Sequence, residues 1–265
     1  MSKIVYDVLR RIGNTLFDVF KTFGEIVILL RQTVESVFHQ VPDHRDSFVQ
    51  MINMGLRTFP VTGLTLLFTG MVLALQTGVS FIGLLNEPVY VGKIVSLSIC
   101  KELGPVLTAL VFSGRVGAAI AAELGTMKVT EQIDALYTLG TNPVRYLVVP
   151  RFIGTLLMLP LLTIYCNWLG IFGGSIVANL KFEIPLSIYW TDVYTLTLSE
   201  MTHGILKSVA FSLIIVTISC YKGLQTRGGA EGVGKSTTAA VVHSMVGVLI
   251  GDYFLSALLT AMRIG

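Results

Sequence analysis

The sequence predicts an all-α polytopic membrane protein, in which an N-terminal amphipathic helix precedes about five transmembrane helices. Of its 265 residues, 53% are hydrophobic and only 13% are charged, and the mean hydropathy is +0.74. These values differ strongly from the balance of a soluble domain. The apolar residues also form several continuous runs that reach the roughly 20 residues a helix needs to cross a bilayer.

The first forty residues predict an amphipathic helix that lies on the membrane surface. Between Ile4 and Leu30, apolar residues recur at intervals of three and four among charged ones. Acidic residues within this stretch argue against a transit peptide, and it lacks the uninterrupted apolar core of a secretory signal. We therefore expect a retained membrane-surface region over residues 1–45 and a transmembrane domain over residues 46–265.

Five apolar segments are long enough to span a bilayer, and they cover approximately residues 60–85, 91–122, 148–179, 204–222 and 239–261. The second and third exceed what about 30 Å of hydrocarbon requires at 1.5 Å per residue. They are therefore predicted to tilt, to break or to project beyond the bilayer. Pro105, Pro150 and Pro160 are the expected break points.

The distribution of basic residues predicts the orientation of the chain. Lys and Arg accumulate on the cytoplasmic side of membrane proteins, and here most lie in the N-terminal region and in the segments around residues 123–147 and 223–238. These parts are therefore expected to be cytoplasmic. The loop over residues 180–203 and the C-terminus are expected on the opposite side.

The segment Gly125–Leu136 predicts a short cytoplasmic helix between the second and third spans. Glu131, Gln132 and Asp134 form one polar face, while the opposite face carries Val129, Ile133, Leu136 and Tyr137. Such a helix can lie at the membrane surface and bind a soluble partner. We interpret it as a coupling helix.

Four charged residues interrupt the apolar spans, where a charge costs a few kcal/mol on insertion scales. They are Lys101 and Glu102 in the second span, Lys207 in the fourth and Asp252 in the fifth. Counted along the predicted spans, all four fall in the outer half of the membrane and are expected to converge. They either neutralise one another as a structural network or line a cavity for a polar headgroup, and the sequence leaves both alternatives open.

Arg115 and Glu123 lie near the cytoplasmic end of the second span. Their spacing and position predict an interfacial ion pair with a structural role.

The residues Gly229–Ser236 match the phosphate-loop pattern G-x-x-x-x-G-K-[ST]. A working phosphate loop leaves a buried strand and opens a helix that packs on a parallel sheet. Here the pattern connects two predicted spans, so we interpret it as a glycine-rich cytoplasmic turn.

The remaining polar residues predict no metal, cofactor or nucleic-acid site in this chain. The four histidines are dispersed, the three cysteines lie inside apolar runs, and the basic residues form no cluster. The sequence also offers no credible pair of nucleophile and base. We therefore expect a chain that is not an enzyme.

Several motifs, in the same order along the chain, resemble the MlaE/YrbE permeases, the membrane subunits of MCE-associated ABC lipid transporters. The motifs are Gly70–Gln76, Lys101–Pro105, Gly114–Gly125, Thr130–Leu136 and Gly229–Gly234, and the resemblance covers about residues 50–262. That family usually has Arg where Lys101 stands, a difference that keeps the charge but loses the bidentate geometry for phosphate.

The resemblance implies a homodimeric permease in a bacterial inner membrane, with a plastid envelope as the alternative location. It implies a cytoplasmic ABC ATPase subunit that uses ATP and magnesium, an MCE-domain protein on the periplasmic side, and phospholipid as cargo. Such transport bears on the lipid asymmetry of the outer membrane. On this hypothesis the ATPase moves a coupling segment made of Thr130, Glu131, Gln132, Ile133, Asp134, Ala135 and Leu136.

The expected lipid-binding residues fall into two groups. Gly70, Met71, Leu75 and Gln76 of the first span are expected to line the acyl chains, and Lys101 and Lys207 to meet the phosphate beside Glu102 and Asp252. An alternative is a proton-coupled secondary transporter, in which the two carboxylates carry protons without an ATPase. Five spans argue against it, because such transporters often show an even inverted repeat.

Overall fold

The computed structural model describes residues 2–39, 44–85 and 90–262, and within these ranges the chain forms helices and short connections without a β-strand. The α-helices are α1 (Ser2–His39), α2 (His44–Gly55), α3 (Phe59–Leu85), α4 (Val91–Ser98), α5 (Gly104–Phe112), α6 (Ala118–Val129), α7 (Gln132–Thr138), α8 (Val149–Phe182), α9 (Leu186–Tyr194), α10 (Leu198–Leu224) and α11 (Gly229–Ala261). Three π-helical turns join some of them, namely η1 (Ile99–Leu103), η2 (Ser113–Gly117) and η3 (Val144–Val148).

Five helical stretches are long and apolar enough to cross a membrane, as predicted. They are Phe59–Ser80, Val91–Val129, Val144–Phe182, Leu198–Leu224 and Gly229–Ala261. The fifth begins ten residues earlier than expected, because the residues predicted as a glycine-rich turn form the first turns of α11. That interpretation of Gly229–Ser236 as a turn is therefore wrong, although two glycines with positive φ, Gly228 and Gly229, do begin the helix.

Two of the three expected break points lie next to π-helical turns. Pro105 is the second residue after η1, and Pro150 is the second residue after η3. Proline lacks an N–H group and collides with the carbonyl of residue i−4, so a wider turn before it relieves both problems. Pro160, in contrast, lies inside α8, which continues without such a turn.

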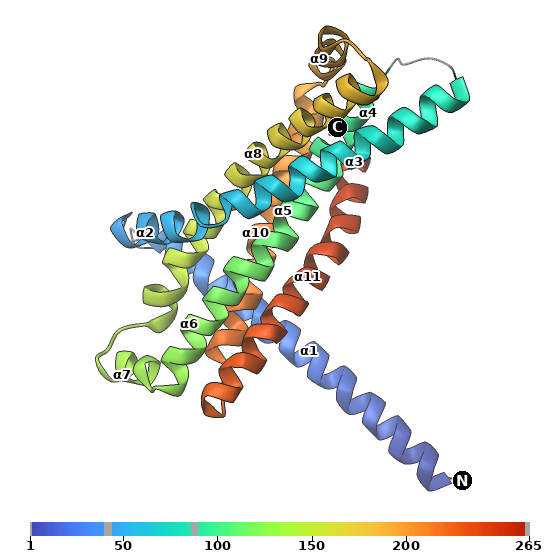
Figure 1. Ribbon diagram of the computed structural model, residues 1–265. Coiled ribbons are helices and arrows are strands. Elements are labelled where there is room, and N and C mark those ends of the chain that lie inside the picture. Colours follow the sequence, from blue (N-terminus) through green and yellow to red (C-terminus); the bar gives the residue numbers. More distant parts are fainter. Residues whose placement is uncertain (1, 40–43, 86–89, 263–265) are drawn as a thin grey trace.

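The helices form a bundle with two distinct ends (Figure 1). The short helices α4 and α9 lie at one end, which we call the α9 end, and α7 lies at the other with the end of α6 and the start of α11. One apolar core, which includes Phe112, Leu162 and Phe211, holds α5, α8 and α10 together. A second core, which includes Val95 and Tyr189, lies toward the α9 end.

Helices α3 and α8 make a close contact that depends on glycine. A Cβ atom at Gly70 would overlap the carbonyl oxygen of Gly170, and one at Gly173 would overlap that of Leu67. Lipid tails are as apolar as the side chains, so helices in a membrane associate mainly through such close packing. This contact fixes the first span against the third.

Helix α9 is held onto α8 by a buried tyrosine. Tyr189 is fully buried, and its hydroxyl donates a hydrogen bond to the carbonyl of Ile171 at 3.0 Å. Burial raises the pKa of Tyr189, so the phenol remains a donor over the physiological pH range. The connection between the third and fourth spans is thereby fixed at the α9 end.

Helix α1 contacts the bundle through its C-terminal half, and the ribbon of its N-terminal half extends away from the bundle (Figure 1). Leu29 and Thr33 are buried, and the Tyr221 hydroxyl donates a hydrogen bond to Glu25 Oε2 at 2.6 Å. That bond lowers the pKa of Glu25 below its usual 4.5. The contact is therefore fully present above pH 4.5 and weakens as the pH falls through the lowered value. The predicted domain boundary after residue 45 stays a prediction.

Gly70→Ala is expected to lower the free energy of unfolding by about 1–3 kcal/mol, the usual effect of overpacking a close contact. The added methyl group must push α3 away from the backbone of Gly170. Gly234→Ala is the matched control, because nothing lies within 4 Å of a Cβ atom at that helical position. Thermal unfolding of the purified chain in mild detergent measures both. Equal stability of the two variants would contradict the close packing of α3 on α8.

Candidate functional site

Three of the four charged residues in the spans meet inside the bundle. Lys207 Nζ lies 2.5 Å from Glu102 Oε2 and 2.9 Å from Asp252 Oδ1. The Lys207 side chain has no exposed surface, whereas Glu102 and Asp252 retain 46% and 23% of theirs. We call these three residues the charge triad. It joins η1, α10 and α11, and therefore the second, fourth and fifth spans.

Local backbone features bring the triad together. Glu102 belongs to the π-helical turn η1, and such turns occur frequently at functional sites because they redirect side chains. Gly204 lies three residues before Lys207 on the same side of α10, and a Cβ atom at Gly204 would overlap the carbonyl oxygen of Cys100. The backbones of α10 and η1 therefore approach closely enough for the lysine to reach its partner.

The triad places one ammonium group between two carboxylates. A buried charge needs this kind of compensation, because removing it from water costs several kcal/mol. Ser256, one turn after Asp252, adds a hydroxyl that donates a hydrogen bond to Glu102 Oε1 at 3.4 Å. The exposed parts of the two carboxylates give the site a polar surface within an apolar span.

The fourth predicted member, Lys101, lies beside the triad but outside it. It is half-buried and has no ion pair among the residues that the structure describes, although its charge acts on Glu200 and His203. His203 is itself buried, one turn before Lys207, and its Nδ1 has no hydrogen-bond partner in the described part of the chain. Lys101 thus differs from Lys207, whose ammonium group is held by two carboxylates.

Sequence reasoning missed His203 and Ser256. A signal was present, because each lies four residues from a triad member on the same helix face, namely Lys207 and Asp252. No role was expected for His203, because the four histidines are too dispersed in the sequence to form a metal site.

The four residues predicted to line the acyl chains have different surroundings. Gly70 is buried in the contact between α3 and α8, and Met71 is half-buried. Leu75 and Gln76 are exposed on α3. Their role in binding lipid stays a prediction, and Gly70 has a packing role that accounts for it without a ligand.

The predicted ion pair between Arg115 and Glu123 is wrong. Glu123 instead pairs with Arg151 of α8, whose Nη2 lies 2.9 Å from Glu123 Oε2. Arg151 is buried, and its Nη1 also donates a hydrogen bond to the carbonyl of Leu147 at 2.7 Å. This pair connects the second and third spans at the end of the bundle where α7 lies. Arg115 forms no ion pair among the residues that the structure describes.

The predicted coupling helix is divided by a sharp turn. Helix α6 ends at Val129, and α7 begins at Gln132 after Glu131, whose φ of 62° lies in the left-handed region. The Lys128 ammonium group crosses this turn to Asp134, with N–O distances of 2.8 and 3.1 Å. The segment from Thr130 to Leu136 is therefore tied to α6.

The apolar face of α7 is narrower than the sequence indicated. Ile133 is buried, and Leu136 packs against the core, but Tyr137 is 62% exposed. Glu131, Gln132, Asp134 and Ala135 are exposed as well. The α7 end thus presents a surface of mixed character that a partner can contact.

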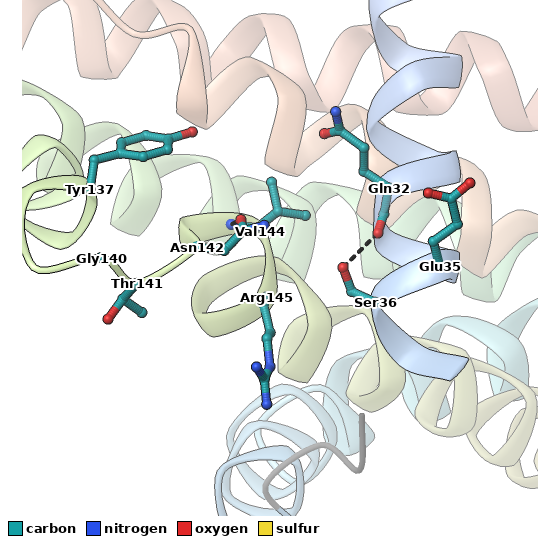
Figure 2. A pocket seen from close by; sticks show the side chains of 9 residues that line it. All are labelled: Gln32, Glu35, Ser36, Tyr137, Gly140, Thr141, Asn142, Val144 and Arg145. Carbon is teal, nitrogen blue, oxygen red and sulfur yellow. Dashed lines mark hydrogen bonds between the residues drawn. The ribbon is translucent and has the colours of Figure 1, made fainter. Parts of the chain in front are cut away.

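An open pocket of about 770 Å³ adjoins α7, between helix α1 and the loop that leads to η3. Figure 2 shows Gln32, Glu35 and Ser36 of α1 on one side of it, with Tyr137 and Arg145 among the residues on the other. The loop is shaped by a hydrogen bond from the backbone N–H of Val144 to Asn142 Oδ1 at 3.0 Å. Sequence patterns did not predict this pocket, because it depends on how α1 packs on a distant loop.

The phosphate-loop string has no phosphate-loop geometry. Residues Gly229–Ser236 form the first turns of helix α11 and not a loop that could surround a phosphate. Lys235 pairs with Glu231 at 2.6 Å, and both side chains are largely exposed. The segment is the start of a membrane span.

Five long apolar helices around a buried ion triad are typical of a membrane transport protein. Comparison with known proteins makes this specific. The chain matches the family Permease MlaE over residues 47–258, and it belongs to that family.

Three relatives illustrate the range of the family. A probable ABC transporter permease protein of Rickettsia conorii is 42% identical over 96% of this chain and 98% of its own length. One of Synechocystis is 44% identical over 82% of each chain. The chloroplastic protein TRIGALACTOSYLDIACYLGLYCEROL 1 of Arabidopsis thaliana is 38% identical over 88% of this chain and 66% of its own length. The chain is therefore a multi-pass permease of an ABC transporter. This class implies an ATPase partner, which argues against the alternative of a proton-coupled secondary transporter.

Lys207→Met is expected to lower the free energy of unfolding by about 3–5 kcal/mol, because it leaves two carboxylates without their cation. Adding Glu102→Gln and Asp252→Asn to this variant removes the unpaired charges and should recover much of the loss. Lys181→Met, an exposed lysine at the end of α8, is the control and should change stability by no more than about 0.5 kcal/mol. Unfolding in detergent measures all three. A triple variant as unstable as Lys207→Met alone would contradict the charge argument.

Proposed function

We propose that this chain is the permease subunit of an ABC transporter that moves phospholipid or a related lipid between the inner membrane and an MCE protein on the outer side. A separate cytoplasmic ATPase subunit, with its ATP and magnesium, drives the movement. The observation that carries the proposal is the polar site inside the spans, where Lys101 lies beside one ammonium group and two carboxylates and forms no ion pair within the described part of the chain. The Arabidopsis relative is named after trigalactosyldiacylglycerol, a galactolipid, and this name supports a lipid as cargo.

On this proposal the two basic residues have different roles. Lys207 is fully buried and already holds two carboxylates, so it acts mainly as the structural centre of the site. Lys101, half-buried on the same π-helical turn as Glu102, is the residue that meets the lipid phosphate. The partly exposed carboxylate of Glu102 next to it suits a positively charged group of a zwitterionic headgroup.

The second span connects the coupling segment to this site. From Glu102 to Val129 the chain is helical throughout, a distance of about 40 Å at 1.5 Å per residue. Helix α7 is tied to its end by the Lys128–Asp134 pair. A movement of α7 by the ATPase therefore acts on Glu102 through one element, and the π-helical turn η2 between them is a place where that element can bend.

Helix α11 is the span best suited to meet a second copy of the chain. Only 11% of its apolar window is buried inside the protomer, against 61% for α10. Its exposed residues include Leu249, Tyr253 and Leu258. A homodimer across this face would enclose the exposed edges of Glu102 and Asp252, and with them a lipid site between two copies. We place the N-terminus and α7 on the cytoplasmic side of the bacterial inner membrane and the α9 end on the periplasmic side.

Lys101→Glu is expected to weaken phospholipid binding about tenfold or more, because it removes a charged hydrogen-bond donor and adds a repulsive charge. Lys93→Glu, an exposed lysine two turns earlier, is the matched control. The tagged chain is purified in mild detergent from its native membrane, and mass spectrometry identifies the lipids and proteins that accompany it. An ATPase, an MCE protein and phospholipid are expected with the unaltered chain. Unchanged lipid content in Lys101→Glu would assign Lys101 to the structural network, whereas recovery of the chain alone and lipid-free would overturn the proposed function.

Glu131→Lys is expected to lower the partner's ATPase stimulation and lipid transport by about fivefold or more, the usual size of a coupling effect. The control is Glu183→Lys, which alters an exposed glutamate with the same left-handed backbone, φ 55°, at the end of α8 next to α9. Both variants should insert in the membrane equally. Activity is measured in proteoliposomes that contain the purified complex. Normal activity of Glu131→Lys would show that α7 is not where the ATPase acts.

A further inference from the structure

A second polar cavity lies far from the charge triad, where α2 meets α3. Its volume is about 290 Å³, and η2 and α6 form its opposite wall. The polar residues that line it are Gln50, Arg57, Thr58, Arg115 and Glu123. The sequence patterns gave no sign of it, because its walls come from segments more than fifty residues apart.

Two guanidinium groups of this cavity lack a protein anion. Among the residues that the structure describes, neither Arg57 nor Arg115 forms an ion pair. The carboxylate at the cavity, that of Glu123, is already paired with Arg151, which does not line the cavity. The cavity therefore has an excess of positive charge, carried by two guanidinium groups without an anion in the described part of the chain.

The position of the cavity matches the surface of a bilayer. Arg57 stands two residues before Phe59, where the first span begins. Helix α2, at the end of α3 remote from α9 (Figure 1), exposes Phe48, Val49 and Ile52, and the exposed Leu56 follows its last residue. An amphipathic helix with such a face lies in the interface, at the depth of the lipid headgroups. The two arginines are thus placed where phosphate groups are abundant.

We propose that this cavity binds a phosphate group through Arg57 and Arg115, separately from the site at the triad. Arginine presents a planar fork of donors that matches phosphate oxygens in pairs. Gln50 adds a neutral polar side chain beside the forks, whereas the Thr58 hydroxyl already donates a hydrogen bond to the carbonyl of Met54 at 2.6 Å. The π-helical turn η2 holds Arg115 on the wall that faces α2. This proposal does not rest on the transport function, since it requires only a membrane surface or a phosphate-containing solution.

The occupant is a lipid phosphodiester or a free phosphate ion, and the site would have a consequence in either case. A bound phosphate would join the α2–α3 junction to the second span, next to the Glu123–Arg151 pair that joins the second span to the third. The three segments would then be fixed together at one level of the bundle. The position of α2 would depend on the anion.

Photo-cross-linking of the full chain in a neutral, phosphate-free detergent tests the proposal. The probe is a phosphatidylethanolamine with a diazirine on its headgroup, and a diacylglycerol with the same diazirine and no phosphate is the matched probe. We expect the phospholipid probe, and not the other, to label peptides that cover residues 50–58 and 115–123. The variant Arg57→Gln/Arg115→Gln should reduce this labelling about tenfold, while Arg227→Gln, an exposed arginine outside the cavity, should leave it unchanged.

Further measurements identify the source of the phosphate and guard against misfolding. If millimolar inorganic phosphate removes the labelling at these peptides, the site accepts the free ion; if it does not, the site selects the lipid headgroup. Arg57→Lys/Arg115→Lys keeps both charges and the fold while it loses the forks, so it should show intermediate labelling. Equal labelling by the two probes, or undiminished labelling in both double variants, would overturn the proposal. Loss of labelling near the triad alone, as in Lys101→Glu, would concern the proposed function and not this site.

Discussion

The ammonium group of Lys207 is the charge around which the second, fourth and fifth spans are arranged. It has no exposed surface, and two carboxylates from different spans lie within 2.9 Å of it. A lone lysine in this position would have to lose its charge or bring in water, because its desolvation is costly. With Glu102 and Asp252 beside it, the same residue becomes a link between three helices. The close approach at Gly204 makes the link possible, since a larger residue would separate α10 from η1.

The other half of the bundle is held by a different physical means. Helices α3 and α8 meet through glycine and backbone, with Gly70 against Gly170. Small residues allow this close approach of the two backbones, whereas the triad leaves parts of its carboxylates exposed. The protein therefore combines a tightly packed pair of spans with a polar group of three.

The second span connects the charge triad to the region of helix α7. It is helical from Val91 to Val129, and two of its turns are π-helical, each with a charged residue, Glu102 in η1 and Arg115 in η2. A regular helix of this length transmits displacement, while a wider turn allows local adjustment. Glu102 and Arg115 thus lie where the backbone is least regular, at the triad and at the cavity between α2 and η2. The link between α7 and a site some 40 Å away needs no further element.

The sequence by itself determined the fold class, the five spans, the family motifs and the presence of costly charges within the spans. It did so because hydrophobic length and helical periodicity are local properties. Lys207, Glu102 and Asp252 carry charged side chains in any arrangement of the helices, so the sequence alone reveals them. The sequence also determined that α7 would be polar and amphipathic, but not that a left-handed Glu131 would separate it from α6. Only the tertiary structure decided which residues meet. It paired Glu123 with Arg151 instead of Arg115, placed Lys101 outside the triad, buried Gly70 in a helix contact and made a helix of the glycine-rich stretch. Periodicity identifies the face on which a side chain lies, but the partner on that face depends on how distant helices cross and rotate, and that is set by the packing of the whole bundle.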